Sequence, residues 1–196
     1  MLYILIVIAF LLGSIPSAYI IGRWVAQSDI RKYGSGNVGT TNVLRTYGIW
    51  PALLTLACDA GKGVLAVGLA KFTGDPVIVA CCGLAVTLGH CYTPFLKFKG
   101  GKALATAAGV AIFLMPYGCC ALIVLFVIVV LISRYVSLGG VVVAAMLPVM
   151  ALLMQYPTPY IVMSILLAIL IIYRHWENIK RIRQGTESRI GEKAKA

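Results

Sequence analysis

Acidic residues are scarce in this sequence of 196 residues. Only 6 positions are Asp or Glu, against 17 Lys or Arg, and charged residues of both signs make up 12% of the chain. With 61% hydrophobic residues, such a composition excludes an ordinary soluble domain, because too much apolar surface would face water. Several apolar runs approach the ~20 residues that a helix needs to cross ~30 Å of hydrocarbon. The composition therefore predicts an integral membrane protein.

Groups that bind metals or form disulfides are also few. The chain has two histidines and six cysteines, but the cysteines lie in apolar segments and lack the Cys/His spacing of a zinc site. We interpret them as small buried hydrophobic side chains. No cluster of carboxylates or histidines suits a hard or borderline metal ion, so we expect no metal and no cofactor.

Seven apolar runs are expected to form membrane-spanning helices. They cover residues 2–22, 49–69, 77–95, 104–115, 118–132, 138–154 and 160–173. The first run lacks the basic start and small-residue cleavage site of a secretory signal, so we interpret it as a retained span. Residues 104–132 could instead form one long helix, but Pro and Gly in MPYG, residues 115–118, favour a turn.

The distribution of basic residues supports seven spans and gives their orientation. With that count, 15 of the 17 Lys and Arg residues fall on one side of the membrane, and cytoplasmic loops are known to collect such residues. The chain has no soluble basic domain, so its formal net charge of +11 does not indicate a nucleic-acid partner. We expect a single all-α transmembrane domain over residues 1–196, with the N-terminus outside and the C-terminus in the cytoplasm.

The first polar stretch on the expected cytoplasmic side is GSGNVGTTN, residues 34–42. Its glycines let consecutive backbone N–H groups turn inward, and its hydroxyl and amide side chains add further donors. Such a nest beside Arg45 suits an anion, especially a phosphate, and the start of a following helix would add its dipole. A flexible solvated loop would use the same residue types, so both interpretations stay open.

The second stretch is GHCYTPFLKFKGGKALAT, residues 89–106. Three lysines surround two glycines there: Lys97, Lys99, Lys102, Gly100 and Gly101. The glycines permit close approach of a ligand, and ammonium groups attract phosphate. A cytoplasmic loop would be rich in lysine in any case. His90 near a helix end is, taken alone, more often a packing or hydrogen-bonding residue than a catalyst.

The third stretch is RHWENIKRIRQGTE, residues 174–187. His175 and Asn178 are three positions apart, so a helix would point both at one ligand, and Glu187 could brace the basic cluster. An anchor on anionic lipid explains the remaining basic and aromatic residues well, but His175 and Asn178 less well. The residues interpreted in that way are Trp176, Arg181 and Arg183.

Two weaker features accompany these stretches. Asp59 and Lys62 lie one helical turn apart inside the second expected span, where charges are costly and usually paired or functional. We interpret them as a mainly structural pair. The short cytoplasmic turn at residues 133–137 is placed to cap the same pocket.

In combination and order, the three stretches resemble those of the bacterial membrane-embedded acyl-phosphate:glycerol-3-phosphate acyltransferases. The first matches at Gly34, Ser35, Gly36, Asn37, Gly39, Thr41, Asn42 and Arg45. The second matches at Gly89, His90, residues 98–102, Ala105 and Thr106. The third matches at Arg174, His175, Asn178, Ile179, Arg181, Gly185 and Glu187. GSIP at residues 13–16 and the Asp59/Lys62 pair also resemble the family, whereas Ala103 departs from it, because a glycine commonly follows the lysine.

The resemblance implies transfer of an acyl group from acyl phosphate to glycerol-3-phosphate, which gives 1-acyl-glycerol 3-phosphate (lysophosphatidate) at the start of bacterial phospholipid synthesis. It implies a bacterial cytoplasmic (inner) membrane, a membrane lipid environment and an active site facing the cytoplasm. The enzyme that supplies the acyl phosphate is a possible partner.

The resemblance also implies roles for individual residues. A substrate phosphate is expected on Gly36, Asn37, Gly39, Thr41, Asn42 and Arg45, with Ser35 near the reaction. Glycerol-3-phosphate is expected on Gly100, Gly101 and Lys102, and His90 is expected among the substrate-binding residues. The reacting centre is expected at His175 and Asn178, with Glu187, Asp59 and Lys62 in support.

The residues leave the mechanism and two other function classes open. No Ser-His-Asp order appears, and His90 is not followed by the Asp of the soluble-type acyltransferase motif, which is His, four residues, then Asp. We expect direct transfer, with His175 or a substrate phosphate oxygen as the base, and rank a covalent Ser35 intermediate third. An organic-phosphate transporter is disfavoured because the polar stretches cluster on one face rather than at the midplane. A noncatalytic scaffold would not need the glycine-rich motifs.

Overall fold

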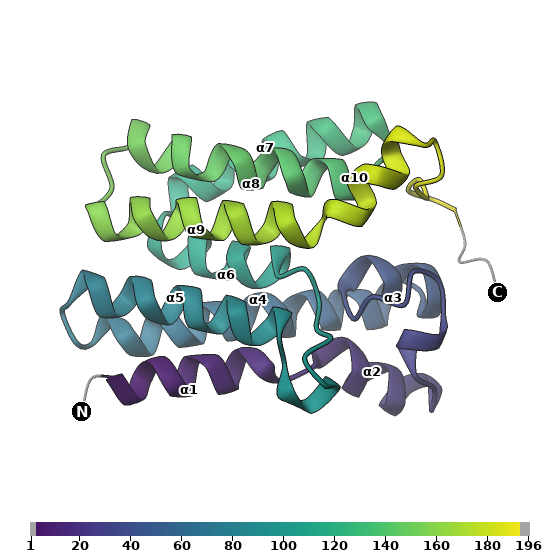
Figure 1. Cartoon of the computed structure of the whole chain (residues 1–196), viewed down its shortest axis with the longest axis horizontal. Helices are drawn as coiled ribbons and strands as arrows, with labels where there is room; N and C mark the ends of the chain where they lie inside the picture. The colour runs from purple at the N-terminus through teal and green to yellow at the C-terminus, as the bar shows by residue number, and fades with distance from the viewer. Residues whose placement is uncertain (1–2, 193–196) are drawn as a thin grey trace.

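The computed structural model describes residues 3–192, and all regular secondary structure in that range is helical. Leu2, the first residue of the first expected span, lies outside the described residues. The elements are α1 (Tyr3–Ser14), α2 (Ser17–Ala26), η1 (Ile30–Lys32), α3 (Thr40–Tyr47), α4 (Ile49–Lys71), α5 (Pro76–Cys91), η2 (Pro94–Leu96), α6 (Leu104–Leu114), α7 (Pro116–Ser133), α8 (Val136–Leu153), α9 (Thr158–Arg174) and α10 (Trp176–Arg183). The long helices run side by side, and the chain begins and ends at opposite ends of the bundle (Figure 1). The all-α prediction is confirmed.

The first expected span is built from two consecutive helices. α1 ends at Ser14 and α2 begins at Ser17, with Pro16 between them. Proline has no N–H, and its ring would collide with the carbonyl four residues earlier in a continuous helix. The break frees the carbonyl of Ile15, which accepts a hydrogen bond from Lys62 Nζ at 3.1 Å. A buried cation of α4 thereby gains a backbone partner inside the bundle.

Residues 104–132 form two helices, as the turn signal in MPYG predicted. α6 ends at Leu114 and α7 begins at Pro116, a position where the missing N–H of proline costs no helical hydrogen bond. Lys102, just before α6, contacts Asn178, and Arg134, just after α7, contacts the carbonyl of Ile190. Both outer ends of this helical hairpin therefore lie at the same end of the molecule.

Glycines make the closest helix contacts. A Cβ atom built on Gly13 of α1 or Gly89 of α5 would lie 2.0 or 2.1 Å from a carbonyl oxygen of the opposite helix. Gly63 of α4 and Gly109 of α6 stand in the same relation, with 2.3 and 2.0 Å. Small residues let membrane helices bring their backbones together in this way. Two reciprocal contacts thus fasten α5 to α1 and α6 to α4.

Helix length and composition agree with a multi-pass membrane protein. Five helical stretches within residues 3–192 are long and apolar enough to cross a membrane, and a sixth is added if α9 and α10, bent by 52°, count as one. α6 has 11 residues, about 17 Å at ~1.5 Å per residue, which is short for a full crossing. The count of seven spans therefore stays a prediction.

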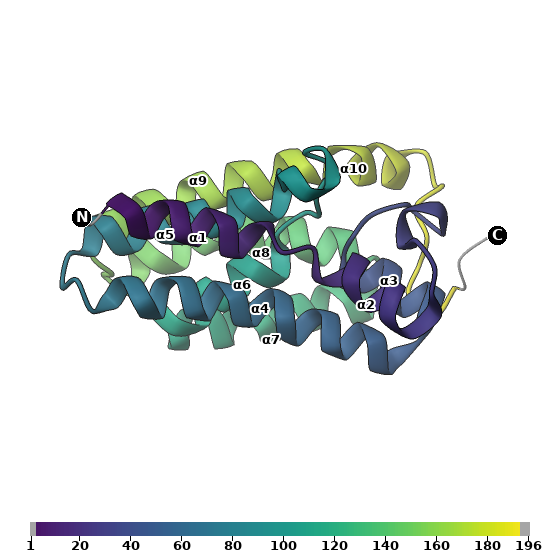
Figure 2. The same cartoon turned by 90° about the horizontal axis from the view of Figure 1, so that it is seen from below.

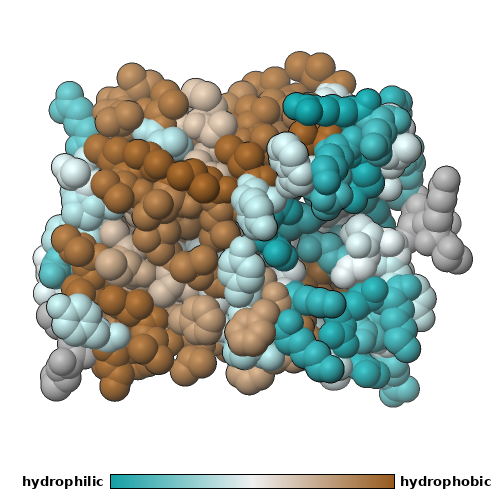
Figure 3. All heavy atoms as spheres, in the orientation of Figure 1, coloured by the Kyte–Doolittle hydropathy of each residue, from teal (hydrophilic) through white to brown (hydrophobic). Residues whose placement is uncertain are grey.

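Polar and apolar side chains separate along the bundle axis. Apolar side chains cover most of the flank shown in Figure 3, and polar ones gather at the end where α3 and α10 lie. The turned view places α2, α3 and α10 together at that end (Figure 2). We call it the polar end, and all three polar stretches of the sequence meet there.

Candidate functional site

A cavity of about 1340 Å³ lies between the loops of the polar end and the interior of the bundle. Its polar wall comes from the three sequence stretches, and its apolar wall from α4, α6, α7 and α8. The predicted site residues on the wall are Ser35, Asn37, Gly39, Thr41, Asn42, Arg45, Asp59, His90, Lys102, His175, Asn178 and Glu187. The predicted residues outside the wall are Gly36, Gly100, Gly101 and Lys62. The structure thus brings most of the candidate site into one space.

Asn42 shapes the loop of the first stretch. Its Oδ1 accepts a hydrogen bond from the backbone N–H of Ser35 at 3.1 Å. Its Nδ2 donates to three backbone carbonyls, those of Ile30, Tyr33 and Asn37. Gly36, with φ +68, provides the left-handed turn between them. The amide of Asn42 is therefore fully engaged with the loop backbone, and its direct contact with substrate stays a prediction.

The same stretch provides the start of a helix. α3 begins at Thr40, after Gly39, and no side chain caps its first turn. The first N–H groups of a helix have no partner within it, and Gly39, Thr40 and Thr41 all lie on the cavity wall. The loop thus leads into the start of a helix, as expected, although α3 is a short separate helix and not the next span. Binding of an anion there stays a prediction.

Ser35 has no activating partner among the described side chains. Its Oγ accepts one long hydrogen bond, from the backbone N–H of Asn37 at 3.5 Å. In residues 3–192 no histidine or carboxylate hydrogen-bonds to this hydroxyl. The geometry offers a hydroxyl donor for a substrate oxygen more readily than a nucleophile.

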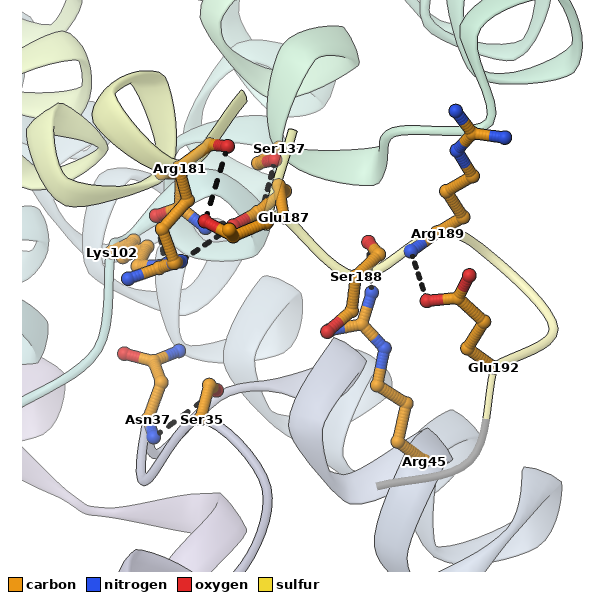
Figure 4. Close-up of polar contacts among 12 residues, drawn as sticks. Ser35, Asn37, Arg45, Lys102, Ser137, Arg181, Glu187, Ser188, Arg189 and Glu192 are labelled. Atoms are coloured by element: carbon orange, nitrogen blue, oxygen red, sulfur yellow. Dashed lines mark hydrogen bonds and ion pairs between the residues drawn. The ribbon is translucent and has the colours of Figure 1, made fainter. Parts of the chain in front are cut away.

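Arg45 connects the first stretch to the C-terminal one. Its Nη2 donates to the carbonyl of Ser188 at 2.9 Å (Figure 4), and both residues line the cavity. The side chain is half-buried, and this burial lowers the pKa of Arg45 from its ordinary value. The guanidinium still carries its charge at neutral pH, because its ordinary pKa lies so far above 7.

The glycines of the second stretch are required for packing. A Cβ on Gly100 would lie 2.1 Å from the carbonyl oxygen of His90, and a Cβ on Gly101 would lie 2.2 Å from His90 Nε2. Arg174 holds the same loop from the other side, with hydrogen bonds of 2.9 and 3.1 Å to the carbonyls of Gly100 and Gly101. The loop is therefore clamped between the ends of α5 and α9.

This clamp directs Lys102 into the cavity. Lys102 Nζ donates to Oδ1 of Asn178, so the second and third stretches meet at this bond. The pKa of Lys102 is lowered to about 8, mainly by burial, with Glu187 opposing the shift and the cations Arg181, Arg174 and Arg45 adding to it. A buried ammonium of this kind is stabilised by an anionic ligand.

Glu187 holds the third stretch together. Its Oε1 accepts hydrogen bonds from Ser137 and Asn178, both at 2.6 Å, and its Oε2 accepts one from Arg181 at 2.8 Å (Figure 4). Burial alone would raise the pKa of Glu187, but these hydrogen bonds and the charge of Arg181 outweigh it and lower the pKa. The carboxylate therefore stays charged and fixes the amide of Asn178.

His175 lies at the bend between α9 and α10. Its Nδ1 is 2.8 Å from the carbonyl oxygen of Ile171, and a carbonyl only accepts, so Nδ1 carries the proton. Burial lowers the pKa of His175 to about 4. The ring is therefore neutral at neutral pH, and its Nε2 has a free lone pair.

Asp59 and Lys62 form a buried charged pair, as predicted, and His90 joins them. Lys62 Nζ lies 2.8 Å from Asp59 Oδ1 and 2.8 Å from His90 Nδ1. Ser17 of α2 donates to Asp59 Oδ1 at 2.9 Å. This network connects α2, α4 and α5, with Asp59 and His90 on the wall of the cavity and Lys62 and Ser17 outside it.

Several residues of the site were missed or misjudged from the sequence. Arg181 was interpreted as part of a lipid anchor, and this is corrected: it pairs with Glu187 and lines the cavity. The motif spacing of Arg181 was the available signal. Ser188 contributes a backbone carbonyl, and no side-chain pattern could have indicated it. Ser137 is on the wall, as the position of its turn indicated.

Comparisons with known proteins agree on one family. The family model described as glycerol-3-phosphate acyltransferase matches residues 3–185. A glycerol-3-phosphate acyltransferase of Syntrophomonas wolfei is 46% identical over 190 residues, which is 97% of each chain. A second, from Moorella thermoacetica, is 44% identical over 189 residues, with 96% of this chain and 97% of the relative covered.

Solved structures give the same result for the fold. A crystal structure of PlsY (YgiH), described as an integral membrane glycerol 3-phosphate acyltransferase in its glycerol 3-phosphate form, superimposes with a TM-score of 0.93 and 36% identity over 97% of this chain and 96% of the other. The lysophosphatidic acid form of PlsY gives a TM-score of 0.90 and 34% identity over 97% and 95% of the two chains.

Proposed function

This chain belongs to the glycerol-3-phosphate acyltransferase family, and we propose that it transfers an acyl group from an acyl phosphate to glycerol-3-phosphate, with lysophosphatidate and phosphate as products. The observation that carries this proposal is a single cavity with a cationic wall at one end and an apolar wall at the other. A lipid-tailed phosphate donor needs both walls, and a small polar acceptor needs only the first.

The polar wall has two separate groups of phosphate-binding character. One is the start of α3 together with the loop at Ser35 and with Arg45, and the other is Lys102 next to Arg181. Two phosphate-bearing substrates require two such groups. An acyl phosphate is already activated, because phosphate leaves readily, so the protein chiefly has to align the acceptor hydroxyl and stabilise the developing charge.

The proposed roles follow from the contacts. Lys102 and Asn178 bind glycerol-3-phosphate, and Glu187 keeps the Asn178 amide in place through the 2.6 Å hydrogen bond. Arg45 and the first turn of α3 bind the donor phosphate. The acceptor proton goes to His175 Nε2 or to an oxygen of the donor phosphate. Direct transfer is favoured over a covalent Ser35 intermediate, because no described base contacts that hydroxyl.

The location of the site is part of the same proposal. Its basic residues lie at the polar end, and basic loops stay on the cytoplasmic side of a membrane. We therefore place the site at the cytoplasmic face of a bacterial inner membrane, where glycerol-3-phosphate arrives from water and the donor from lipid. An enzyme that makes acyl phosphates would be a suitable neighbour there.

An assay with purified protein tests the donor. We expect palmitoyl phosphate and glycerol-3-phosphate together to give inorganic phosphate and lysophosphatidate in equal amounts. Palmitoyl-CoA in place of palmitoyl phosphate should give neither product. Equal rates with both donors, or product from palmitoyl-CoA alone, would contradict an acyl-phosphate enzyme while leaving the family assignment intact.

The same preparation tests the base and the main rival function. Near-normal turnover of the His175→Ala variant would assign the proton to the substrate phosphate. Uptake of glycerol-3-phosphate into proteoliposomes without lysophosphatidate would indicate a transporter.

A further inference from the structure

The two histidines of the chain line the same cavity from different elements. His90 is near the end of α5, and His175 follows the end of α9. Both are at least nine-tenths buried, with exposures of 8% and 4%. Their Nδ1 atoms contact partners of opposite kind, and this difference decides where each neutral ring carries its proton.

His90 faces a donor. Lys62 Nζ contacts three acceptors: Asp59 Oδ1 at 2.8 Å, the Ile15 carbonyl at 3.1 Å and His90 Nδ1 at 2.8 Å. An ammonium has three protons and no acceptor capacity, so all three are used and Nδ1 of His90 must accept. Asp59 Oδ1 lies farther from Nδ1, at 3.5 Å, and already accepts from Lys62 and Ser17. The ring proton of His90 is therefore on Nε2.

His175 faces an acceptor, the Ile171 carbonyl, so its proton is on Nδ1 and its Nε2 is bare. Neither Nε2 is a sealed atom: within the described residues, the buried polar side-chain atoms that lack both a partner and solvent contact are hydroxyls of Thr40, Thr46 and Thr106. Each Nε2 therefore has contact with open space, and the cavity is the space that both residues line. One histidine presents an N–H there and the other a lone pair.

We propose that His90 is a fixed hydrogen-bond donor to the acyl carbonyl oxygen, held in the Nε2–H tautomer by the positioning residues Lys62 and Asp59. This rests on the proposed acyl transfer. His90 lines the cavity near the end of α5, 3.5 Å from Asp59 Oδ1, and the wall continues along α4 beyond Asp59 with the small and apolar residues Ala60, Gly61 and Val64. The carbonyl of an acyl phosphate lies between its phosphate and its acyl chain, and so belongs between the polar and the apolar part of the wall.

The chemistry of the step fits a neutral donor there. The acceptor hydroxyl oxygen bonds to the acyl carbon, its proton leaves to the base, and the carbonyl electron pair moves onto oxygen. When that pair returns, the bond from carbon to the phosphate oxygen breaks and phosphate leaves. His90 Nε2–H would stabilise the transient oxyanion without giving up its proton. Lys62 neutralises Asp59 at 2.8 Å, so the carboxylate does not repel the oxyanion.

The packing at Gly101 supports the same role. A Cβ at this position would lie 2.2 Å from Nε2 of His90 and would displace or cover the donor. The carbonyl of His90 also accepts the N–H of Gly101 at 3.1 Å. The His90 ring and the loop that carries Lys102 therefore fix each other's position.

Nitrogen-15 NMR of the histidine rings tests the tautomers directly. The chain has only two histidines, so protein labelled with 15N-histidine gives four ring nitrogens, which His175→Gln assigns. We expect a protonated Nε2 and a bare Nδ1 for His90, and the reverse for His175. A proton on Nδ1 of His90 would overturn the proposal. In Lys62→Met, His90 should lose its single tautomer.

A matched pair of variants tests the donor. In His90→Asn, the amide oxygen can still accept from Lys62, but no N–H reaches the position of Nε2. In His90→Gln, the amide can place an N–H near that position. We expect kcat to fall on the order of 10²-fold in His90→Asn, to recover at least tenfold in His90→Gln, and KM for glycerol-3-phosphate to change little in both.

Equal kcat values for the two variants, or a fall confined to KM, would overturn the donor role. Thermal unfolding of both variants separates loss of the donor from loss of the fold, because a structural role alone would lower kcat and the unfolding temperature together. The NMR result needs no substrate. If the wild-type protein failed to use acyl phosphate, the proposed function would be contradicted, but the NMR experiment would still determine the two histidine tautomers.

Discussion

Lys102, which we propose as a ligand of glycerol-3-phosphate, has a charge that changes with pH not far above neutrality. Its pKa is lowered to about 8, mainly by burial, so the ligand-free protein loses this ammonium as the pH rises through 8. We expect KM for glycerol-3-phosphate to rise about tenfold per pH unit above that value, since the charged fraction falls at that rate. Initial rates at saturating acyl phosphate between pH 7 and 9.5 measure this.

Lys102→Arg is the matched control, because a guanidinium keeps its charge throughout this range. At pH 7 the KM of this variant should be higher than that of the wild-type protein, because the guanidinium does not have the shape of the ammonium group. It should then stay constant up to pH 9.5. Unfolding cannot cause the same rise in KM. Between pH 8 and the ordinary lysine pKa of 10.5, Lys102 binds more protons in the unfolded chain than in the folded protein. The contribution of Lys102 to the free energy of unfolding therefore rises with pH. A wild-type KM that stays constant to pH 9.5 would contradict the prediction.

The types of residue at the site could be predicted, whereas their partners could not. Sequence spacing indicated Arg45, Lys102, His175 and Asn178, because cations, amides and glycines are unusual in so apolar a chain. Spacing says nothing about contacts between residues far apart in the chain. The bond from Arg45 to the Ser188 carbonyl is of this kind, and only the fold supplies it.

At the scale of helices, two glycines of α4 give opposite predictions. A Cβ on Gly63 would lie 2.3 Å from the Thr106 carbonyl, whereas a Cβ on Gly61 meets nothing within 4 Å. Gly63→Ala should therefore push α6 from α4 and lower the unfolding free energy by about 1–3 kcal/mol. Gly61→Ala should leave it unchanged or raise it by up to ~1 kcal/mol, because alanine favours a helix.

Thermal unfolding in one detergent compares the two variants. They lie on the same helix and make the same chemical change, so detergent and helix propensity affect both alike. A Gly63→Ala protein as stable as Gly61→Ala would show that α4 and α6 are not in close backbone contact.

The sequence predicted the presence of helices better than it predicted where a helix is interrupted. Long apolar runs gave α4, α5, α7, α8 and α9 nearly at their observed positions. Proline alone did not indicate the division at Pro16, because proline is tolerated within membrane helices when neighbouring groups satisfy the freed carbonyl. Here the neighbour is Lys62, which belongs to another helix and is brought near only by the fold.

At the scale of the whole molecule, the number of full crossings depends on the hairpin of α6 and α7. Both of its outer ends lie at the polar end. The remaining helices therefore have the same orientation in the membrane whether the hairpin tip at Met115 reaches the opposite surface or stops within the membrane. The termini lie at opposite ends in both cases (Figure 1). The orientation and the count of seven are therefore separate questions.

Single cysteines, in a background without the six native ones, decide both questions in intact spheroplasts. Phe72→Cys and Gln155→Cys mark the turns opposite the polar end, and Lys180→Cys marks the polar end itself. With the N-terminus outside, a membrane-impermeant maleimide should label the first two, and should label Lys180→Cys only after permeabilisation. The reverse pattern would overturn the orientation.

Tyr117→Cys then decides the count. Tyr117 lies just after the hairpin tip and is 79% exposed, so the fold itself does not shield it. If α6, despite its 11 residues, and α7 both cross, local thinning of the bilayer must bring the tip to the outer surface. Labelling should then match that of Phe72→Cys. Absence of labelling, with both outer markers reactive, would show a hairpin that ends inside the membrane and reduce seven crossings to five.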